Sequence, residues 1–212
     1  MTIRNREPLS SLVLYHFAKW SIISPILHTY FRGRIYGAEK IPQSGSYIVV
    51  SNHASNLDPP LLGIAVRRPV SFMAKEELFH VPILKTTIAL YGAYPVKRNA
   101  SDRSAIRSAI ESIDRGWVAG LFLEGKRTAD GKINDPKLGA ALISAKTNSP
   151  LIPASIWGTE KIRSASLFSL PSPITIRFGD IIPPPKSKKK PDLQAVTDLC
   201  AKTINEMHSL GR

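Results

Sequence analysis

The chain has 212 residues, 43% of them hydrophobic, and its 29 Lys and Arg residues exceed its 16 Asp and Glu residues to give a formal net charge of +13. This composition excludes a disordered chain, and the length allows one sizeable α/β domain with a small appendage. The charge favours an anionic partner, namely nucleic acid, an anionic membrane surface or a phosphorylated substrate. Because Cys200 is the only cysteine, an internal disulfide is excluded as well.

The first 36 residues predict an amphipathic helical segment that associates with a membrane surface. Apolar residues dominate positions 11–31, and arginines at positions 4, 6, 32 and 34 flank this run. Lys19 near the centre and Pro25 argue against a clean membrane span, and Lys19 also interrupts the apolar stretch that a signal peptide needs. A helix that is apolar nearly all round and flanked by arginines suits contact with a membrane through residues 1–31. The alternative is a helix that covers the core of the domain.

From residue 37 to residue 182, predicted strands alternate with predicted helices. The apolar runs that predict strands are Tyr47–Val50, Val70–Ala74, Trp117–Leu123, Pro150–Trp157 and Pro173–Phe178, with a shorter run at Tyr94–Val96 whose proline indicates an edge position. The predicted helices lie between them, over residues 59–66, 77–90, 101–116 and 140–147. This alternation predicts an α/β fold with a largely parallel central sheet flanked by helices.

Residues 183–212 predict a linker and a final helix packed on the domain. The linker, residues 183–191, is stiff because of its prolines and basic because of its lysines. Its lysines suit either solvent or an anionic membrane surface. Asp192 is expected to cap the helix, which carries apolar side chains at Leu193, Val196 and Leu199.

An imidazole and a carboxylate stand five positions apart in Asn52-His53-Ala54-Ser55-Asn56-Leu57-Asp58, directly after the first of these strands. Pro59-Pro60 follows, and proline suits the first turn of a helix. His53 and Asp58 are therefore expected in a strand-to-helix loop, where open α/β sheets bind their ligands. A histidine held by a carboxylate is a general base with a fixed tautomer. For Asp58 the alternative is a structural role as the N-cap of the helix.

Further charged residues follow the ends of other predicted strands. Lys75, Arg98 and Glu124 each come just after a strand, and Arg127 follows in the same loop as Glu124. If the strands are parallel, all of these side chains gather with His53 at one edge of the sheet. Three cations and a base around one crevice predict a site for a phosphorylated substrate. A solvated loop charge is the alternative for each of these residues taken alone.

Four segments, in chain order, carry a family resemblance: Asn52-His53-x4-Asp58, Gly92-Ala93-Tyr94-Pro95-Val96-Lys97-Arg98, Phe122-Leu123-Glu124-Gly125-Lys126-Arg127-Thr128 and Leu151-Ile152-Pro153-Ala154. They resemble the four motifs of the glycerolipid acyltransferases, and within them those of the bacterial 1-acyl-sn-glycerol-3-phosphate acyltransferases (lysophosphatidic acid acyltransferases). The segment Met73–Phe79 is similar to the one that supplies a phosphate-binding lysine in this family. Leu123, Lys126 and Thr128 depart from the usual Pro, Thr and Ser of the third motif.

The resemblance implies an enzyme that moves a fatty acyl group from acyl-CoA or acyl-ACP to the sn-2 hydroxyl of 1-acyl-sn-glycerol 3-phosphate (lysophosphatidic acid). The product would be phosphatidic acid for phospholipid synthesis, made at the cytoplasmic face of a membrane by a peripheral or monotopic protein. His53 would be the general base, oriented by Asp58. The residues implied in substrate binding are Lys75, Arg98 and Arg127, which would hold the phosphate, together with Glu124, Gly125 and Pro153. Direct transfer without an acyl-enzyme is expected, because Gly-x-Ser-x-Gly is absent from the chain.

Two other interpretations are open at this point. One is an acyltransferase for another acceptor, either glycerol 3-phosphate or a different lysophospholipid; the other is a non-catalytic basic module on a membrane surface. Nucleic-acid binding is not expected, since the basic linker has no aromatic neighbour on which bases could stack. No cofactor and no metal are expected, because the histidines at positions 16, 28, 53, 80 and 208 form no pair with zinc-ligand spacing.

Overall fold

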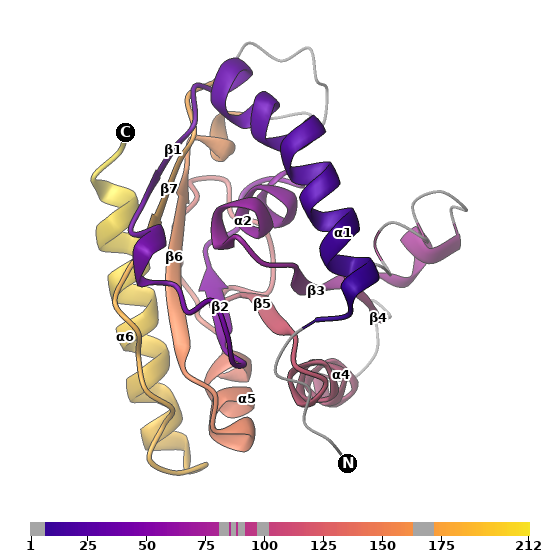
Figure 1. Ribbon diagram of the computed structural model, residues 1–212. Helices are drawn as coiled ribbons and strands as arrows, with labels where there is room; N and C mark the ends of the chain where they lie inside the picture. The colour runs from indigo at the N-terminus through magenta and orange to yellow at the C-terminus, as the bar shows by residue number, and fades with distance from the viewer. Residues whose placement is uncertain (1–6, 81–84, 86–87, 89–91, 97–101, 163–171) are drawn as a thin grey trace.

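The computed structural model of the chain describes residues 7–80, 85, 88, 92–96, 102–162 and 172–212. Within these residues seven strands form one sheet, in the order β1-β7-β6-β2-β5-β3-β4 (Figure 1). The strands are β1 (Arg34–Tyr36), β2 (Ile48–Ser51), β3 (Val70–Lys75), β4 (Tyr94–Val96), β5 (Val118–Phe122), β6 (Leu151–Trp157) and β7 (Thr175–Phe178).

Five neighbouring strands of this sheet, β6, β2, β5, β3 and β4, run parallel to one another. β7 is antiparallel to β6, and β1 runs parallel to β7. The predicted α/β fold with a largely parallel sheet is therefore confirmed, and β4 lies at an edge, as its proline indicates. The sequence does not predict β1, because three residues between Gly33 and Gly37 form no apolar run. That strand exists because it pairs with the distant β7.

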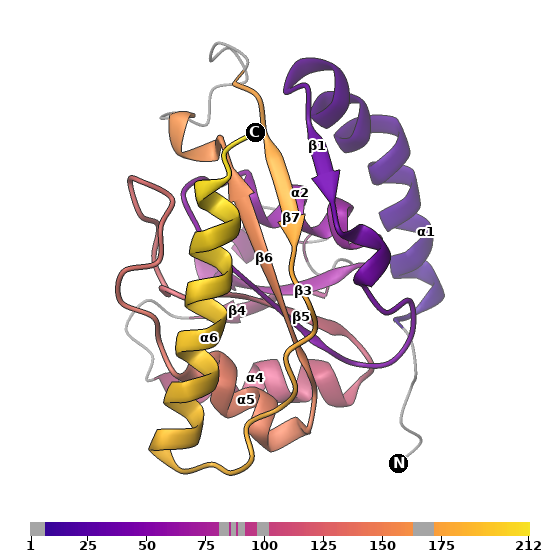
Figure 2. The same ribbon diagram turned by 90° about the vertical axis from the view of Figure 1, so that its left-hand side faces the viewer.

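Helices cover both faces of the sheet (Figures 1 and 2). α4 (Asp102–Asp114), α5 (Gly139–Thr147) and α6 (Lys190–Ser209) pack on one face, where their buried side chains form an apolar cluster with Ile48 and Val50 of β2. α2 (Asp58–Val66) and the N-terminal helix pack on the other face, in a second cluster that contains Val49. Burial on both faces explains why β2 is a continuous run of Ile and Val instead of an alternating pattern.

The predicted cap of the last helix is wrong, and another predicted helix begins as a different kind of helix. The helix expected over residues 77–90 begins as a short 3-10 helix, η4 (Glu76–His80), and most of residues 81–91 lies outside the described residues. α6 begins two residues before the predicted cap, because Pro191 fits the first turn of a helix. Asp192 does not cap α6; its carboxylate accepts a hydrogen bond from Ser187 Oγ and so ties the basic linker to the start of the helix.

The N-terminal segment forms the predicted helix. It consists of α1 (Leu9–Ala18) followed by two wider π-helical stretches, η1 (Lys19–Ile23) and η2 (Ile26–Tyr30). Its inner side is buried: Leu27 and Phe31 belong to the core cluster around Val49, and the Tyr15 hydroxyl donates to the Gly63 carbonyl of α2. The helix therefore covers the core of the domain. Among the described residues, no helix combines the length and apolar character that a membrane crossing would require.

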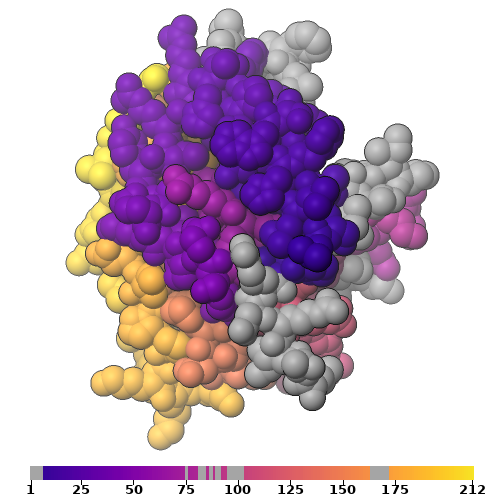
Figure 3. Space-filling model, in the orientation of Figure 1, coloured from indigo at the N-terminus to yellow at the C-terminus, as the bar shows by residue number. Residues whose placement is uncertain are grey.

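The outer side of the same helix is also apolar. Leu9, Val13, Phe17 and Trp20 are between 64% and 80% exposed, and their spacing of three and four residues places them along one side of the helix. We call this set the apolar ridge. Figure 3 shows that the N-terminal segment occupies much of the upper part of one face of the molecule. This segment therefore presents one apolar side to the core and another to the surroundings.

A buried ion pair holds the start of the N-terminal helix against the domain. Glu7 Oε1 lies 2.8 Å from Nη2 and 3.0 Å from Nε of Arg68, and both side chains are almost completely buried. Arg68 Nη1 also donates to the Gly45 carbonyl, and its guanidinium lies over the ring of Tyr47. Burying two charges is costly unless they meet with good geometry, so this pair fixes one position of the helix on the domain.

Candidate active site

The end of β2 is fixed by Asn52, whose side chain continues the pairing of the sheet. Asn52 Nδ2 donates to the Ile156 carbonyl at 2.8 Å, and Asn52 Oδ1 accepts from the Ile156 N–H at 2.8 Å. The same Nδ2 also donates to the Gly131 carbonyl at 2.7 Å. Asn52 therefore joins β2 to β6 and to the segment that follows β5. The chain leaves the sheet at His53, at the edge where the parallel strands end, which we call the carboxyl edge.

His53 and Asp58 form the predicted pair. His53 Nδ1 lies 2.7 Å from Asp58 Oδ2, and the same oxygen accepts the N–H groups of Ala54 and Ser55 at 2.7 and 2.8 Å. The Asp58 side chain is completely buried, whereas that of His53 is 17% exposed. An ionised carboxylate can only accept hydrogen bonds, so Nδ1 carries the proton and donates it in a hydrogen bond, which leaves Nε2 of the neutral ring as the basic nitrogen.

The alternative role of Asp58 as a helix N-cap is wrong. α2 begins at Asp58 itself, the residue at the N-cap position is Leu57, and no side chain caps the helix. The carboxylate turns back to the loop that precedes α2 and binds the N–H groups of Ala54 and Ser55. We call this loop, residues 52–57, the β2 loop. Its shape therefore depends on the same carboxylate that holds the imidazole.

The imidazole also rests on an aromatic side chain from the neighbouring strand. The rings of His53 and Phe122 are stacked, with centroids 3.8 Å apart and 12° between the planes, and Phe122 in turn stacks on Phe72. The His53 carbonyl accepts the Thr128 N–H at 2.8 Å. The sequence gives no sign of this role for Phe122, because an apolar residue at the end of a buried strand is expected in any sheet. The stacking on Phe122 and the contact with Asp58 leave the ring of His53 little freedom to rotate.

Glu124 and Gly125 shape the segment between β5 and α5, residues 123–138, which we call the β5 loop. Glu124 is only 3% exposed, and its Oε2 accepts the N–H groups of Asn134 and Asp135 at 2.8 and 2.9 Å. Gly125 has φ +71° and donates its N–H to the Phe122 carbonyl at 3.0 Å, so the loop turns through a conformation that favours glycine. Both residues lie at the carboxyl edge, and these contacts are to backbone groups.

Arg127 lies beside the β2 loop. Its Nη1 donates to Asn56 Oδ1 at 3.0 Å, and the side chain is exposed. Since Arg127 comes from the β5 loop and Asn56 from the β2 loop, this hydrogen bond joins the two loops at the surface. The guanidinium carries five N–H donors, so it can bind an anion as well as Asn56.

Of the other predicted site residues, Pro153 is fully described, Lys75 only in its backbone and Arg98 not at all. Lys75 is the last residue of β3, which is parallel to its neighbour β5, so its backbone reaches the carboxyl edge; its side chain lies outside the described part of the structure. Arg98 lies outside the described residues. Pro153 is buried within β6, where it pairs with Val50 and its carbonyl accepts the Gly179 N–H. It therefore lies in the sheet and not in the open loops at the carboxyl edge.

The described residues also bear on metals and on covalent chemistry. Within the part of the chain that the structure describes, no group of three or more His, Cys, Asp or Glu side chains could hold a metal ion. Cys200 is completely buried in α6, and burial raises the pKa of its thiol to about 12. Because the thiolate is the nucleophilic form, Cys200 is a packed apolar residue and not a carrier of an acyl group.

Comparison with known proteins gives one consistent result. The Acyltransferase family model matches residues 32–157, more than half of the chain. The chain is 33% identical over 153 residues to the chloroplastic 1-acyl-sn-glycerol-3-phosphate acyltransferase BAT2 of Brassica napus, which covers 70% of this chain and 44% of that protein. It is 28% identical over 126 residues to the 1-acyl-sn-glycerol-3-phosphate acyltransferase of Bacillus subtilis (strain 168), which covers 59% of this chain and 62% of that one. The chain thus spans less than two thirds of these relatives.

A solved structure shares the fold over most of the chain. It is the crystal structure of the 1-acyl-sn-glycerophosphate (LPA) acyltransferase PlsC from Thermotoga maritima, with a TM-score of 0.74 and 27% sequence identity. The similarity covers 93% of this chain and 79% of that one. The fold, the matched family and the His53–Asp58 pair therefore agree.

Proposed function

Because the chain belongs to the Acyltransferase family, we propose that it transfers a fatty acyl group to the sn-2 hydroxyl of 1-acyl-sn-glycerol 3-phosphate and so makes phosphatidic acid. The proposed donor is a thioester, either acyl-CoA or acyl-ACP. The names of the relatives and of the PlsC structure support this acceptor. The single observation that carries the proposal is the 2.7 Å contact between His53 and the buried Asp58 at the carboxyl edge.

His53 acts as the general base in the proposed reaction. An alcohol is a weak nucleophile, so Nε2 takes its proton while the alcohol oxygen attacks the carbonyl carbon of the thioester. The tetrahedral intermediate then collapses, the C–S bond breaks, and the proton passes from Nε2 to the departing thiolate. Asp58 keeps the ring in the tautomer that leaves Nε2 basic and stabilises the imidazolium once it has formed. The acyl group passes directly from donor to acceptor, without an acyl-enzyme.

Arg127 binds the phosphate of the acceptor in this proposal, together with Lys75 and Arg98. A close contact between two unit charges is worth up to ~4 kcal/mol at an effective dielectric constant of ~20, before desolvation is subtracted. Arg127 is exposed, so salt screens its contribution. The benefit is mainly one of orientation, because a fixed phosphate brings the sn-2 hydroxyl to Nε2 of His53. Glu124 and Gly125 support this site by shaping the loop that carries Arg127.

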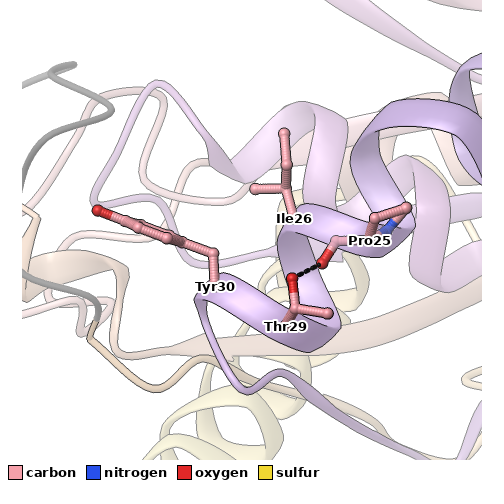
Figure 4. A pocket seen from close by; sticks show the side chains of 4 residues that line it. All are labelled: Pro25, Ile26, Thr29 and Tyr30. Atoms are coloured by element: carbon pink, nitrogen blue, oxygen red, sulfur yellow. Dashed lines mark hydrogen bonds between the residues drawn. The ribbon is translucent and has the colours of Figure 1, made fainter.

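The N-terminal segment supplies a surface that suits contact with lipid. We propose that the apolar ridge rests on the cytoplasmic face of a membrane, which holds the protein where its acceptor is found. A shallow recess near the end of the same helix is lined by Pro25, Ile26, Thr29 and Tyr30 (Figure 4). Thr29 Oγ1 donates to the Pro25 carbonyl at 2.6 Å. The Thr29 hydroxyl and the Pro25 carbonyl therefore satisfy each other without water, as an apolar environment requires.

An acyl-transfer assay tests the function. Purified protein is incubated with acyl-CoA or acyl-ACP and one of three acceptors: lysophosphatidic acid, glycerol 3-phosphate or lysophosphatidylcholine. Phosphatidic acid, formed from lysophosphatidic acid and detected by mass spectrometry, is the expected product. If the protein instead used only glycerol 3-phosphate or only lysophosphatidylcholine, that compound would be its acceptor and the proposed acceptor would be wrong. Absence of transfer in all six combinations would leave the non-catalytic membrane module as the better interpretation.

Flotation with lipid vesicles tests the membrane contact separately. Replacing Val13, Phe17 and Trp20 together by Ser removes most of the apolar ridge but leaves the buried side of the helix intact. We expect the unaltered protein to float with vesicles that contain anionic lipid, and the triple variant to stay at the bottom of the gradient. The matched control is Leu199→Ser, which alters an exposed leucine of α6 on the opposite face of the sheet. Equal flotation of all three proteins would rule out the ridge as the contact.

A further inference from the structure

The C-terminal helix reaches the β5 loop through one side chain that bonds in both directions. Asn205 Oδ1 accepts the Ile133 N–H at 3.0 Å, and Asn205 Nδ2 donates to the Ile133 carbonyl at 2.9 Å. Both backbone groups of Ile133 are therefore paired with one residue of α6. An amide side chain is suited to this because it carries a donor and an acceptor side by side. Ile133 itself is buried in the cluster between α6 and the sheet.

A second contact one turn further along α6 brings the helix still closer to the loop. Gly131 has φ +69°, and a Cβ atom placed on it would lie 2.7 Å from Nε2 of His208. A side chain at position 131 would therefore clash with His208, which is almost completely buried. The loop approaches α6 as closely as a glycine allows.

The same short stretch of the β5 loop also contacts Asn52 and His53 at the start of the β2 loop. The Gly131 carbonyl accepts from Asn52, the residue before the general base, and the Thr128 N–H donates to the carbonyl of His53. Arg127 stands next to Thr128 and bonds Asn56 of the β2 loop. Asn205 is therefore joined to Ile133, and from there the backbone of the loop continues through Gly131 and Thr128 to Arg127, the cation proposed to bind phosphate.

We propose that Asn205 is a positioning residue, which holds the β5 loop so that Arg127 faces the acceptor beside His53. This inference rests on the proposed function. Asn205 touches no substrate in it and acts only through the loop. A misplaced binding group weakens orientation of the acceptor, and displacements of about 1 Å can cost up to ~100-fold in rate. Since Arg127 contributes to binding more than to the chemical step, we expect a misplaced loop mainly to raise the KM for the acceptor.

Two variants of Asn205 separate its hydrogen bonds from its packing. Asn205→Ala removes both hydrogen bonds, whereas Asn205→Asp has the same shape but loses the donor and places a carboxylate oxygen against the Ile133 carbonyl. We expect each to raise the KM for lysophosphatidic acid by about tenfold, with kcat and the KM for the acyl thioester changed much less. The matched control is Gln194→Ala, which removes an exposed amide from the same helix. A folded Asn205→Asp protein with an unchanged acceptor KM would overturn the inference.

A double-variant cycle tests whether Asn205 acts through Arg127. If it does, Asn205→Ala has little further effect on the acceptor KM in a protein that already carries Arg127→Ala. An equal increase in both backgrounds would show that the substitution only weakens the protein in general, and the inference would fail.

Amide hydrogen exchange tests whether Asn205 holds the β5 loop, and this measurement does not depend on turnover. In Asn205→Ala the N–H groups of Thr128 and Ile133 are expected to exchange faster, while in Gln194→Ala they exchange as in the unaltered protein. Unchanged protection of Thr128 would contradict the inference even in an active enzyme. If the unaltered protein transfers no acyl group to lysophosphatidic acid, the proposed function fails, and the exchange at Thr128 still shows whether Asn205 holds the loop.

Discussion

The β2 loop and the β5 loop are built in the same way at neighbouring positions of one sheet. Each follows a buried strand, and the two strands pair in parallel, so both loops leave the sheet at the carboxyl edge. Each is organised by one buried carboxylate, Asp58 or Glu124, that accepts two backbone N–H groups with a single oxygen. A carboxylate in such a place first satisfies loop amides that would otherwise be buried without partners.

The third partner distinguishes the two loops. The oxygen of Asp58 that holds the backbone also accepts a hydrogen bond from the ring of His53, whereas the hydrogen bonds of Glu124 described above are with backbone amides. We therefore infer that Asp58 serves both the loop and the chemistry, and that Glu124 serves the loop that presents Arg127. A buried carboxylate at the carboxyl edge is therefore not by itself a sign of catalysis.

Replacing His53 should have the largest effect. His53→Ala removes the proposed base, and general-base catalysis typically contributes about 10²- to 10⁴-fold, so kcat should fall within that range. The melting temperature should change little, because the Asp58 contacts to the β2 loop persist. Measurement of kcat together with thermal unfolding checks both statements. Near-normal turnover by the folded variant would refute the role of His53.

Asp58→Asn sharpens the comparison within one loop. The amide oxygen can still accept from the β2 loop, but an uncharged side chain cannot stabilise the imidazolium and can favour the wrong tautomer. We expect kcat to fall by about 10²- to 10³-fold with a smaller change in the KM for either substrate. If kcat fell no further than in the equivalent change at Glu124, the distinction between the two carboxylates would be lost.

Arg127→Ala tests what the β5 loop presents. In the proposed function the guanidinium binds the acceptor in the ground state and the transition state alike, so the acceptor KM should rise by about tenfold while kcat stays close to its normal value. Lys132→Ala, which removes another exposed cation of the same loop, is the control. Steady-state kinetics at low and high salt would show the difference shrinking with ionic strength. Equal KM values for the two variants would contradict the assignment.

Glu124→Gln should have the smallest effect on turnover. Its amide oxygen keeps one acceptor for the two backbone N–H groups but loses the charge, and charge-assisted hydrogen bonds are about twice as strong as neutral ones. We expect a loss of about 1 kcal/mol in the free energy of unfolding and a modest rise in acceptor KM. Urea denaturation and kinetics measure the two quantities. A loss of kcat as large as that of Asp58→Asn would point to direct contact between Glu124 and the reacting groups.

The sequence predicts the parts of this site that depend on strand ends. His53, Glu124 and Arg127 could be assigned to one edge because apolar runs mark where β2 and β5 stop and because alternating strands and helices imply a parallel sheet. The pairing of His53 with Asp58 follows from their spacing within one short loop. These are local patterns, and local patterns are what a single sequence shows.

Contacts between distant segments could not be predicted. The partners of Glu124 lie ten and eleven residues later in an irregular loop, and those of Asn52 lie in β6 and in the β5 loop. No periodicity marks such partners, because each depends on where the folded sheet brings the chain. For the same reason Asp58 could not be distinguished from a helix cap. Pro153 lies in a predicted strand, but the sequence could not show that it pairs with Val50 inside the sheet.

The buried Glu7–Arg68 pair has a practical consequence for anyone who trims this protein for study in water. Removing the first helix together with Glu7 would leave the Arg68 guanidinium buried without its partner. Breaking such a pair typically costs about 3–5 kcal/mol of stability. The cut would also uncover the side of α2 that Tyr15 now seals. A fragment that lacks this helix would therefore unfold, and its failure in an activity assay would give no information about contact with lipid. To obtain the protein without detergent, it is better to keep every residue from Glu7 onward and to make only the outward-facing side of that helix polar.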